Sequence, residues 1–274
     1  FPDRVVPMLP EALSNGMCSL RPNEDRACLA VQITIDKQGK KLSHKFFRAL
    51  MRSKARVTYE DLQSTFDSKE KIQSSGDFIG KLAIPLYGAF NALHTARLIR
   101  GALDIEVPEM QVQLDTKGNV ESIKDRGRLD SHRLIEEFMV LANVCAAETL
   151  EEKKYPCVYR VHDVPNKDKV DGLRLNLEAF GIKLIKGQVI TSKSFNDILK
   201  NAAKHDAKET INQLVLRSQS QAIYSSNNLG HFGLGLRRYA HFTSPIRRYS
   251  DLLVHRALIL AHNYGTPDTD TLIS

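Results

Sequence analysis

The chain has 274 residues, 42% of them hydrophobic and 26% charged, a composition typical of soluble globular proteins and sufficient for one large domain or two small ones. Its net charge of +7 favours an anionic partner. No apolar run of about 18 residues is present, so we expect neither a membrane span nor a membrane partner.

The first predicted elements form a hairpin followed by a helix. Alternating apolar residues over 29–35 predict a half-buried strand, and 36–39 (DKQG) predicts a turn. The run 41–52 is interpreted as the returning strand. Thr58 is expected to begin a short helix, because Asp61 follows at the spacing of an imperfect capping box.

The polar segment 64–76 is interpreted as a loop. Apolar residues at helical spacing predict a helix over 86–103 that ends near Gly101. The segment 110–123 is broken by a Lys-Gly-Asn sequence and is expected to form a β-hairpin.

A long helix is predicted from Asp130 or Ser131, either of which could cap it, to about Glu152. Its middle is apolar on every face except at Asn143. Because a helix that is apolar all round is a buried one, this helix is expected to run through the core.

The second half is predicted to be mainly helical. A short strand is expected over 157–161, and Gly181 is a plausible end for the first helix that follows it. The mixed order of strands and helices predicts an α/β or α+β domain with helices packed on a mixed β-sheet. The helices expected here are 169–180, 194–203, 209–224 and 245 to about 262.

The four cysteines show no C-x-x-C spacing, which disfavours a zinc site and a disulfide-linked partner. We interpret them as small thiols in a reducing cytoplasm. No signal peptide is visible, although the chain begins with Phe1 and the natural N-terminus is expected to lie further upstream.

The most informative stretch is 217–256, which contains six arginines, no lysine, no glutamate and one aspartate. Within it, Ser244 suits a helix N-cap and Pro245 suits the first helical position. Arg247 and Arg248 would then lie in the first turn, where free amides and arginine side chains favour a phosphate. The alternative is an ordinary helix with a solvated basic end.

Glycines and aromatic residues surround these arginines. Gly230, Gly233 and Gly235 would allow another backbone to approach closely. Aromatic faces interleaved with arginine are typical of proteins that bind single-stranded nucleic acid. The aromatic residues interleaved with the arginines include Tyr224, His231, Phe232, Tyr239, His241, Phe242 and Tyr249. Arg247 and Arg248 would point about 100° apart on a helix, so only one is expected to reach a given phosphate.

Five blocks of the sequence resemble the catalytic domain of the ribonuclease II / ribonuclease R exoribonucleases, and the ribonuclease R branch more closely. They occur in the family's order and span nearly the whole chain. The blocks are VVPMLPEALSNGMCSL (5–20), ARVTYEDL (55–62), RLDSHRLIEEFMVLAN (128–143), YRVHDVP (159–165) and the run 222–258 with GHFGLGL and YAHFTSPIRRY.

The resemblance implies hydrolysis of single-stranded RNA from its 3′ end to nucleoside monophosphates, with Mg²⁺ as cofactor. It also implies that the whole chain, 1–274, is the central and C-terminal portion of one such domain, without cold-shock or S1 domains. In the family, an aspartate cluster with a D-x-D-D core binds the metal and lies upstream of the first block. No D-x-D-D sequence occurs in the chain; the nearest approximation is 268–270 (DTD), in a polar tail. We therefore expect a fragment with little or no activity of its own.

The resemblance also assigns roles to individual residues. Arg247 is expected to contact the scissile phosphate, and Tyr59 to stack on or clamp the 3′-terminal nucleotides. On its local pattern alone, Tyr59 is a surface tyrosine at a helix start. A glutamate of the 128–143 block would face the RNA 3′ end. Glu136 is preferred over Glu137 because it shares a helical stripe with Asn143.

Either glutamate could instead be favoured only by the helix dipole. The residues expected to line or support the RNA path are Arg248, Tyr249, His241, Gly233, Gly235 and Glu137. The alternatives to an exoribonuclease domain are a non-catalytic RNA-binding module and an assembly subunit whose basic patch meets another protein.

Overall fold

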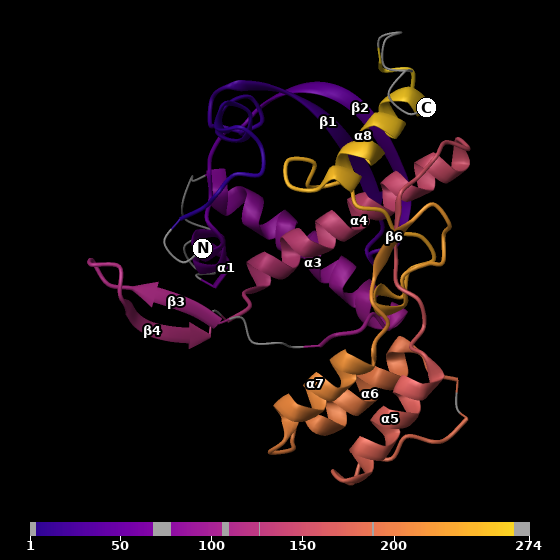
Figure 1. Ribbon diagram of the computed structural model, residues 1–274. Helices are drawn as coiled ribbons and strands as arrows, with labels where there is room; N and C mark the ends of the chain where they lie inside the picture. Colours follow the sequence, from indigo (N-terminus) through magenta and orange to yellow (C-terminus); the bar gives the residue numbers. More distant parts are fainter. Residues whose placement is uncertain (1–3, 68–77, 106–109, 126, 188, 266–274) are drawn as a thin grey trace. The chain divides into compact units, whose positions relative to one another are not determined.

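The structure is a computed structural model that describes residues 4–67, 78–105, 110–125, 127–187 and 189–265 (Figure 1). The segment 68–77, the larger part of the loop expected over 64–76, lies outside the described residues, as does 268–270.

The chain forms two compact units. Unit 1 comprises Phe1–Ala96, Glu109–Pro156 and His241–Ser274. Unit 2 comprises Arg97–Pro108 and Cys157–Ala240. The assignment of the whole chain to one domain stays a prediction.

Unit 1 contains a long antiparallel hairpin of β1 (Asp25–Ile35) and β2 (Lys41–Arg52). The hairpin and its turn were predicted, although β1 begins four residues earlier than expected. In the turn, Gly39 has a φ of +76°, and a Cβ there would lie 2.2 Å from the carbonyl oxygen of Ala92 in α3. Gly39 therefore allows the hairpin to pack directly against a helix backbone.

The remaining elements of unit 1 include a second hairpin at the predicted place. Thr58 precedes α1 as predicted, and its Oγ1 accepts the Asp61 amide at 3.1 Å. The helix expected over 86–103 begins eight residues earlier, at Phe78, and continues through Pro85. The elements are η1 (Ala12–Met17), α1 (Tyr59–Asp67), α3 (Phe78–Arg100, which ends in unit 2), β3 (Met110–Leu114), β4 (Val120–Asp125), α4 (Asp130–Glu152) and α8 (Tyr249–Ala261).

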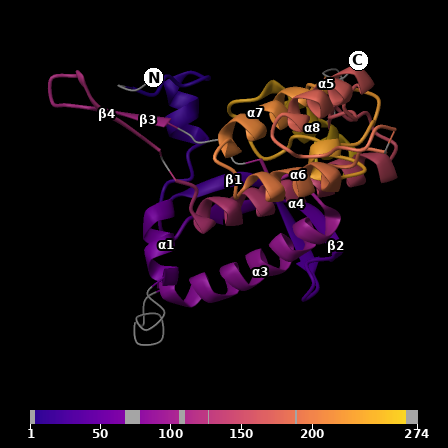
Figure 2. The ribbon, with the colours of Figure 1, turned by 90° about the horizontal axis from the view of Figure 1, so that it is seen from below.

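The core of unit 1 is built on α4. This helix has the predicted bounds, but the residue at its N-cap is Leu129 and neither Asp130 nor Ser131 caps it. Ser131 lies inside the first turn, and its amide donates to Oε1 of Gln63 in α1 at 3.0 Å, so a side chain of another helix satisfies this free amide. Helices α1 and α8 both pack on α4. Figure 2 shows α1 beside α3 and α4. Between α1 and α3, the rings of Phe66 and Tyr87 stack with 3.6 Å between their centroids.

Unit 2 contains a helical cluster and a short two-stranded sheet. Figures 1 and 2 show α5 (Lys167–Glu178), α6 (Ser192–Ala202) and α7 (Lys208–Ser218) gathered around one apolar core. Gly181, with a φ of +72°, follows α5 as predicted. The other elements of this unit are β5 (Tyr159–Val161), β6 (Ile223–Ser225) and the short 3₁₀ helix η2 (Phe232–Leu234).

The helix predicted over 209–224 is too long. Helix α7 ends at Ser218, whose hydroxyl donates to the Val215 carbonyl at 2.7 Å and so competes with the helix hydrogen bonds. The last residues of the predicted helix belong to β6, where Ile223 pairs with Val161.

The mixture of helices and strands confirms the predicted α/β or α+β class. In the described part of the chain the strands form three two-stranded antiparallel sheets instead of joining in one mixed sheet. Two of the three are hairpins closed by short turns, so their pairing is satisfied locally. Within the described residues, no helix is both long and apolar enough to cross a bilayer.

Candidate nucleic-acid interface

The segment Ser244–Arg248 is a turn that precedes the last helix, so the prediction of a helix beginning at Pro245 is wrong. Helix α8 begins at Tyr249, with Arg248 at its N-cap. The amides of Arg247 and Arg248 donate to the Ser244 carbonyl at 3.2 and 3.1 Å. Ser244 does not cap the helix. Its own amide donates to Oδ1 of Asp251 at 2.7 Å.

The cause of this difference is the buried carboxylate of Asp251, which is 0% exposed. A charge out of contact with water requires hydrogen-bond donors. The turn supplies two of them, the Ser244 amide and the Arg248 guanidinium, the latter at 2.8 Å. A helix that began at Pro245 would place these donors elsewhere.

The residues just before the turn are held by buried side chains from two helices. Asn143, in α4 and 2% exposed, accepts the amides of Phe242 at 2.8 Å and Thr243 at 3.3 Å through its Oδ1. His255, in α8, donates from Nε2 to the Phe242 carbonyl at 2.8 Å and stacks on that ring at 4.4 Å. The backbone that leads into the turn is therefore fixed from both α4 and α8.

The two neighbouring arginines have different environments. Arg248 is bound to Asp251, and its side chain is 23% exposed. Arg247 is exposed, and its side chain makes no hydrogen bond or ion pair with any residue that the structure describes. A guanidinium held on a fixed backbone and left without an internal partner is suited to an anionic ligand, and its fork geometry matches a phosphate.

Tyr59 is the first residue of α1 and is 39% exposed. Its ring lies against the ring of His132 in α4, with 4.2 Å between the centroids and 32° between the planes. Tyr59 begins α1, and Arg247 lies two residues before α8. Both of these helices pack on α4. An exposed ring supported by a second ring can stack on a nucleobase.

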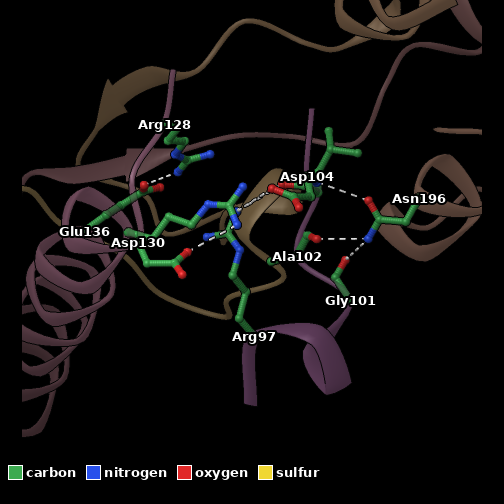
Figure 3. Close-up of polar contacts among 10 residues, drawn as sticks. Arg97, Gly101, Ala102, Asp104, Arg128, Asp130, Glu136 and Asn196 are labelled. Atoms are coloured by element: carbon green, nitrogen blue, oxygen red, sulfur yellow. Dashed lines mark hydrogen bonds and ion pairs between the residues drawn. The ribbon is translucent and has the colours of Figure 1, made fainter. Parts of the chain in front are cut away.

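The two candidate glutamates of α4 differ in burial. Glu136 is half-buried and forms an ion pair with Arg128, which Figure 3 shows at the start of the helix. Glu137 is 6% exposed and belongs to the buried face. Glu137, and not Glu136, therefore shares a face with Asn143, because the buried face of α4 includes positions 134, 137 and 140 as well as Asn143.

The glycines assigned to the RNA path, Gly233 and Gly235, lie in unit 2 and meet parts of this chain. A Cβ on Gly233 would lie 2.9 Å from Nδ1 of His162, and the Gly233 amide donates to that nitrogen at 3.0 Å. Gly235 has a φ of +61°, and a Cβ there would lie 3.1 Å from the Arg100 carbonyl oxygen. The predicted close approach of another backbone is therefore present at Gly235, whereas Gly233 is approached by a side chain.

In the same unit, Asn196 of α6 is hydrogen-bonded to the segment that follows α3. Its Nδ2 donates to the Ala102 carbonyl at 2.9 Å, and its Oδ1 accepts the Asp104 amide at 3.1 Å (Figure 3). Of the remaining candidates, which belong to unit 1, Tyr249 is exposed and His241 is half-buried.

Sequence reasoning did not assign roles to Asn143, Asp251 and His255. Asn143 was noticed only as the polar interruption of an apolar helix. Asp251 could have been found as the one acidic residue of the arginine-rich stretch, three positions after Arg248. The groups to which these residues are hydrogen-bonded could not be read from the sequence.

The residues described do not fit the magnesium centre that the resemblance implies. Among them, no three or more His, Cys, Asp or Glu side chains are grouped so that they could hold a metal ion. Magnesium requires several hard oxygen ligands in nearly octahedral geometry. No chemical step is therefore assigned to a metal at these residues.

The environment of His255 predicts a pH-dependent stability. Burial lowers the pKa of His255 below its usual 6.5, although its hydrogen bond to the Phe242 carbonyl and the charge of Asp251 oppose this. The unfolded chain therefore binds a proton at a higher pH than the folded one. The stability from this group is complete above the unfolded pKa and is lost as the pH falls towards the folded pKa.

We expect the melting temperature to fall between about pH 7.5 and about pH 5.5, and His255→Gln to make this fall less steep. Burial also lowers the pKa values of His44, His162 and His262, so some of the slope will persist. Thermal unfolding followed by circular dichroism measures both slopes. An unchanged slope in the variant would contradict the assignment.

Comparison with known proteins identifies the family. The family model described as "RNB domain" matches residues 1–263. Ribonuclease R of Vibrio parahaemolyticus is 41% identical over 258 residues, which are 94% of this chain and 31% of that protein. The chain thus spans about a third of the length of the curated relatives it matches.

The fold agrees with solved structures of the same family. Ribonuclease R of Mycoplasma genitalium in complex with ribose-methylated single-stranded RNA matches with a TM-score of 0.88 and 31% identity, over 98% of this chain and 42% of that one. The same enzyme in complex with double-stranded RNA also matches with a TM-score of 0.88, over 97% of this chain and 48% of that one. The predicted resemblance, including its closer relation to the ribonuclease R branch, is confirmed: the chain belongs to the RNB domain family of exoribonucleases.

Proposed function

We propose that this chain binds the 3′-terminal nucleotides of single-stranded RNA and takes part in their hydrolysis, one nucleoside monophosphate at a time, as part of a cytoplasmic, magnesium-dependent exoribonuclease. One observation carries the proposal. Arg247 lies exposed on a turn whose backbone is fixed by Asn143 and Asp251, and its guanidinium has no partner among the described residues. The complexes of the Mycoplasma enzyme with RNA support the same substrate class.

The proposed mechanism uses the side chains of unit 1. Arg247 binds the scissile phosphate and stabilises the charge that develops there during hydrolysis. Tyr59 stacks on a base near the 3′ end and so sets the register of the strand. Glu136 is proposed to face the 3′ end, which requires it to part from Arg128, while Arg248 acts by fixing the turn.

The other residues are assigned to the RNA path. Tyr249 and His241 are proposed to contact the strand in unit 1, where the buried Glu137 is proposed to support the path from within. Gly233 and Gly235 are proposed to shape a part of the path that belongs to unit 2. Magnesium dependence is part of the proposal for the full-length gene product.

RNA binding by the 274-residue chain is expected to be strongly salt-dependent, because phosphate contacts release counterions. With a fluorescently labelled single-stranded RNA, we expect the affinity to fall about tenfold between about 50 and about 200 mM NaCl. Fluorescence anisotropy measures this directly. Affinity that is absent, or does not change with salt, would favour an assembly subunit whose partner is a protein.

The isolated 274-residue chain is expected to hydrolyse RNA far more slowly than the full-length gene product in the presence of magnesium. The reason is that phosphodiester hydrolysis in such enzymes needs carboxylate-held metal ions, and no D-x-D-D sequence occurs in these residues. Denaturing gels of 5′-labelled RNA measure both rates. Equal rates would refute this expectation, and a full-length product that binds but does not degrade RNA would favour a non-catalytic binding module.

A further inference from the structure

We propose that Asp251 is a positioning residue for Arg247. It acts by binding Ser244 and Arg248, the two ends of the turn. Because Arg248 is then held by Asp251, Arg247 is the arginine of the turn whose guanidinium can bind RNA. The inference rests on the proposed function, since it explains how the phosphate-binding side chain is placed.

The first support is the set of donors around Asp251. Its Oδ1 accepts the Ser244 amide at 2.7 Å and a guanidinium nitrogen of Arg248 at 2.8 Å, and its Oδ2 accepts the Ser250 hydroxyl at 3.3 Å. One carboxylate oxygen thus binds both ends of the turn, three residues before Arg247 and one residue after it. The turn is fixed at both ends by a side chain from α8.

The second support is the choice between a helix and a turn. Ser244 followed by Pro245 favours a helix start, with Ser244 as the cap. Asp251 instead binds the Ser244 amide, and the helix begins five residues later, at Tyr249. Asp251 therefore selects the turn, and with it the exposure of Arg247.

The third support is the division of charge between the two arginines. The Nε of Arg248 is buried and has no hydrogen-bond partner among the described residues, so Asp251 is the group that holds this guanidinium. Without the carboxylate charge, Arg248 would be released beside Arg247. Two adjacent guanidinium groups would then compete for one phosphate in several arrangements.

A double-mutant cycle in the full-length, RNA-degrading protein tests the inference. Asp251→Asn keeps an oxygen that can accept the Ser244 amide but removes the charge that holds Arg248. We expect it to lower kcat on single-stranded RNA about 10-fold to 100-fold, with KM changed less than about threefold. In an Arg247→Ala background the same substitution should change kcat less than about twofold, because the group it positions is gone.

Two further variants complete the design. Asp25→Asn makes the same substitution at an exposed ion pair with Arg52, and we expect it to change kcat less than about twofold. If Asp251→Asn does not fold, as judged by circular dichroism, Arg248→Gln serves in the same cycle, since it keeps Asp251 and its bond to Ser244.

The outcomes separate the inference from the proposed function. The positioning role would be overturned if Asp251→Asn has a normal kcat, or if it lowers kcat by the same factor with and without Arg247. Either result would leave the proposed function intact. An Arg247→Ala variant with normal kcat would overturn both. A loss of kcat from Asp251→Asn that disappears in the Arg247→Ala background supports both.

Discussion

Replacing Arg247 with alanine is expected to lower kcat for RNA hydrolysis about 100-fold or more in the full-length protein, while weakening single-stranded RNA binding less than about fivefold. The reason is that one guanidinium adds little to an interface with many phosphate contacts, whereas it is most strongly bound to the phosphate when charge develops there. Single-turnover hydrolysis gives the rate, and anisotropy under conditions that prevent turnover gives the affinity.

Two variants make this result specific. Arg247→Lys keeps the charge but loses the fork, and we expect a partial loss of rate. Arg52→Ala removes the last residue of β2, an arginine whose partner is the exposed Asp25 of β1, and should leave both the rate and the affinity unchanged. Equal losses of rate and affinity in Arg247→Ala would show that the residue only binds RNA.

Asn143→Leu is expected to destabilise unit 1 by about 2–4 kcal/mol. Leucine has a similar volume but cannot accept the amides of Phe242 and Thr243, so two backbone groups would lose their partner. The change is measured by urea unfolding followed by far-ultraviolet circular dichroism, because the chain has no tryptophan whose fluorescence could report unfolding.

The matched control is Asn176→Leu, at an exposed position of α5, which should change the free energy of unfolding by less than about 0.5 kcal/mol. Asn143→Leu should also lower RNA hydrolysis by any protein that stays folded, because the backbone leading to Arg247 would no longer be held from α4. A variant with unchanged stability and normal hydrolysis would show that the Asn143 hydrogen bonds are not needed to position Arg247.

The elements that sequence predicted well are those determined by local pattern. The buried helix α4 has the expected bounds, and both the 25–52 and 110–125 segments are hairpins, because their turns carry a glycine at a positive φ. Long apolar periodicity and turn chemistry act over a few residues, so one sequence is enough to detect them.

The elements that were misjudged depend on distant partners. The sequence around Pro245 is that of a helix start, but the buried Asp251 binds the amide that the helix would have used. Helix α7 similarly ends six residues before its predicted end, where Ile223 pairs with Val161 more than 60 residues earlier in the chain. Local propensity cannot anticipate such competition.

The candidate site was predicted in part. Arg247 was singled out as a phosphate ligand for its place in a helix, whereas the structure presents it on a turn, with Arg248 withdrawn into an ion pair. The preference for Glu136 relied on a helical stripe shared with Asn143, but the structure buries Glu137 together with Asn143, so only that stripe was misjudged and the role of Glu136 at the RNA 3′ end stays a prediction. Adjacent residues of a helix point about 100° apart, so a small rotation of the helix decides which of the two glutamates faces the core. The spacing of apolar residues does not fix that rotation closely enough.

The order of the two units along the chain has a consequence for synthesis. Residues 157–240 of unit 2 separate α4 from the turn, and the Asn143 oxygen and the Phe242 amide are 99 positions apart. A ribosome must therefore synthesise the chain past residue 242 before the backbone that leads to Arg247 can be held from α4, because domains fold as units when their last segment emerges. A nascent chain that ends before residue 242 lacks the hydrogen bond between the Asn143 oxygen and the Phe242 amide, so the proposed phosphate-binding turn cannot be held from α4 until this segment has been made.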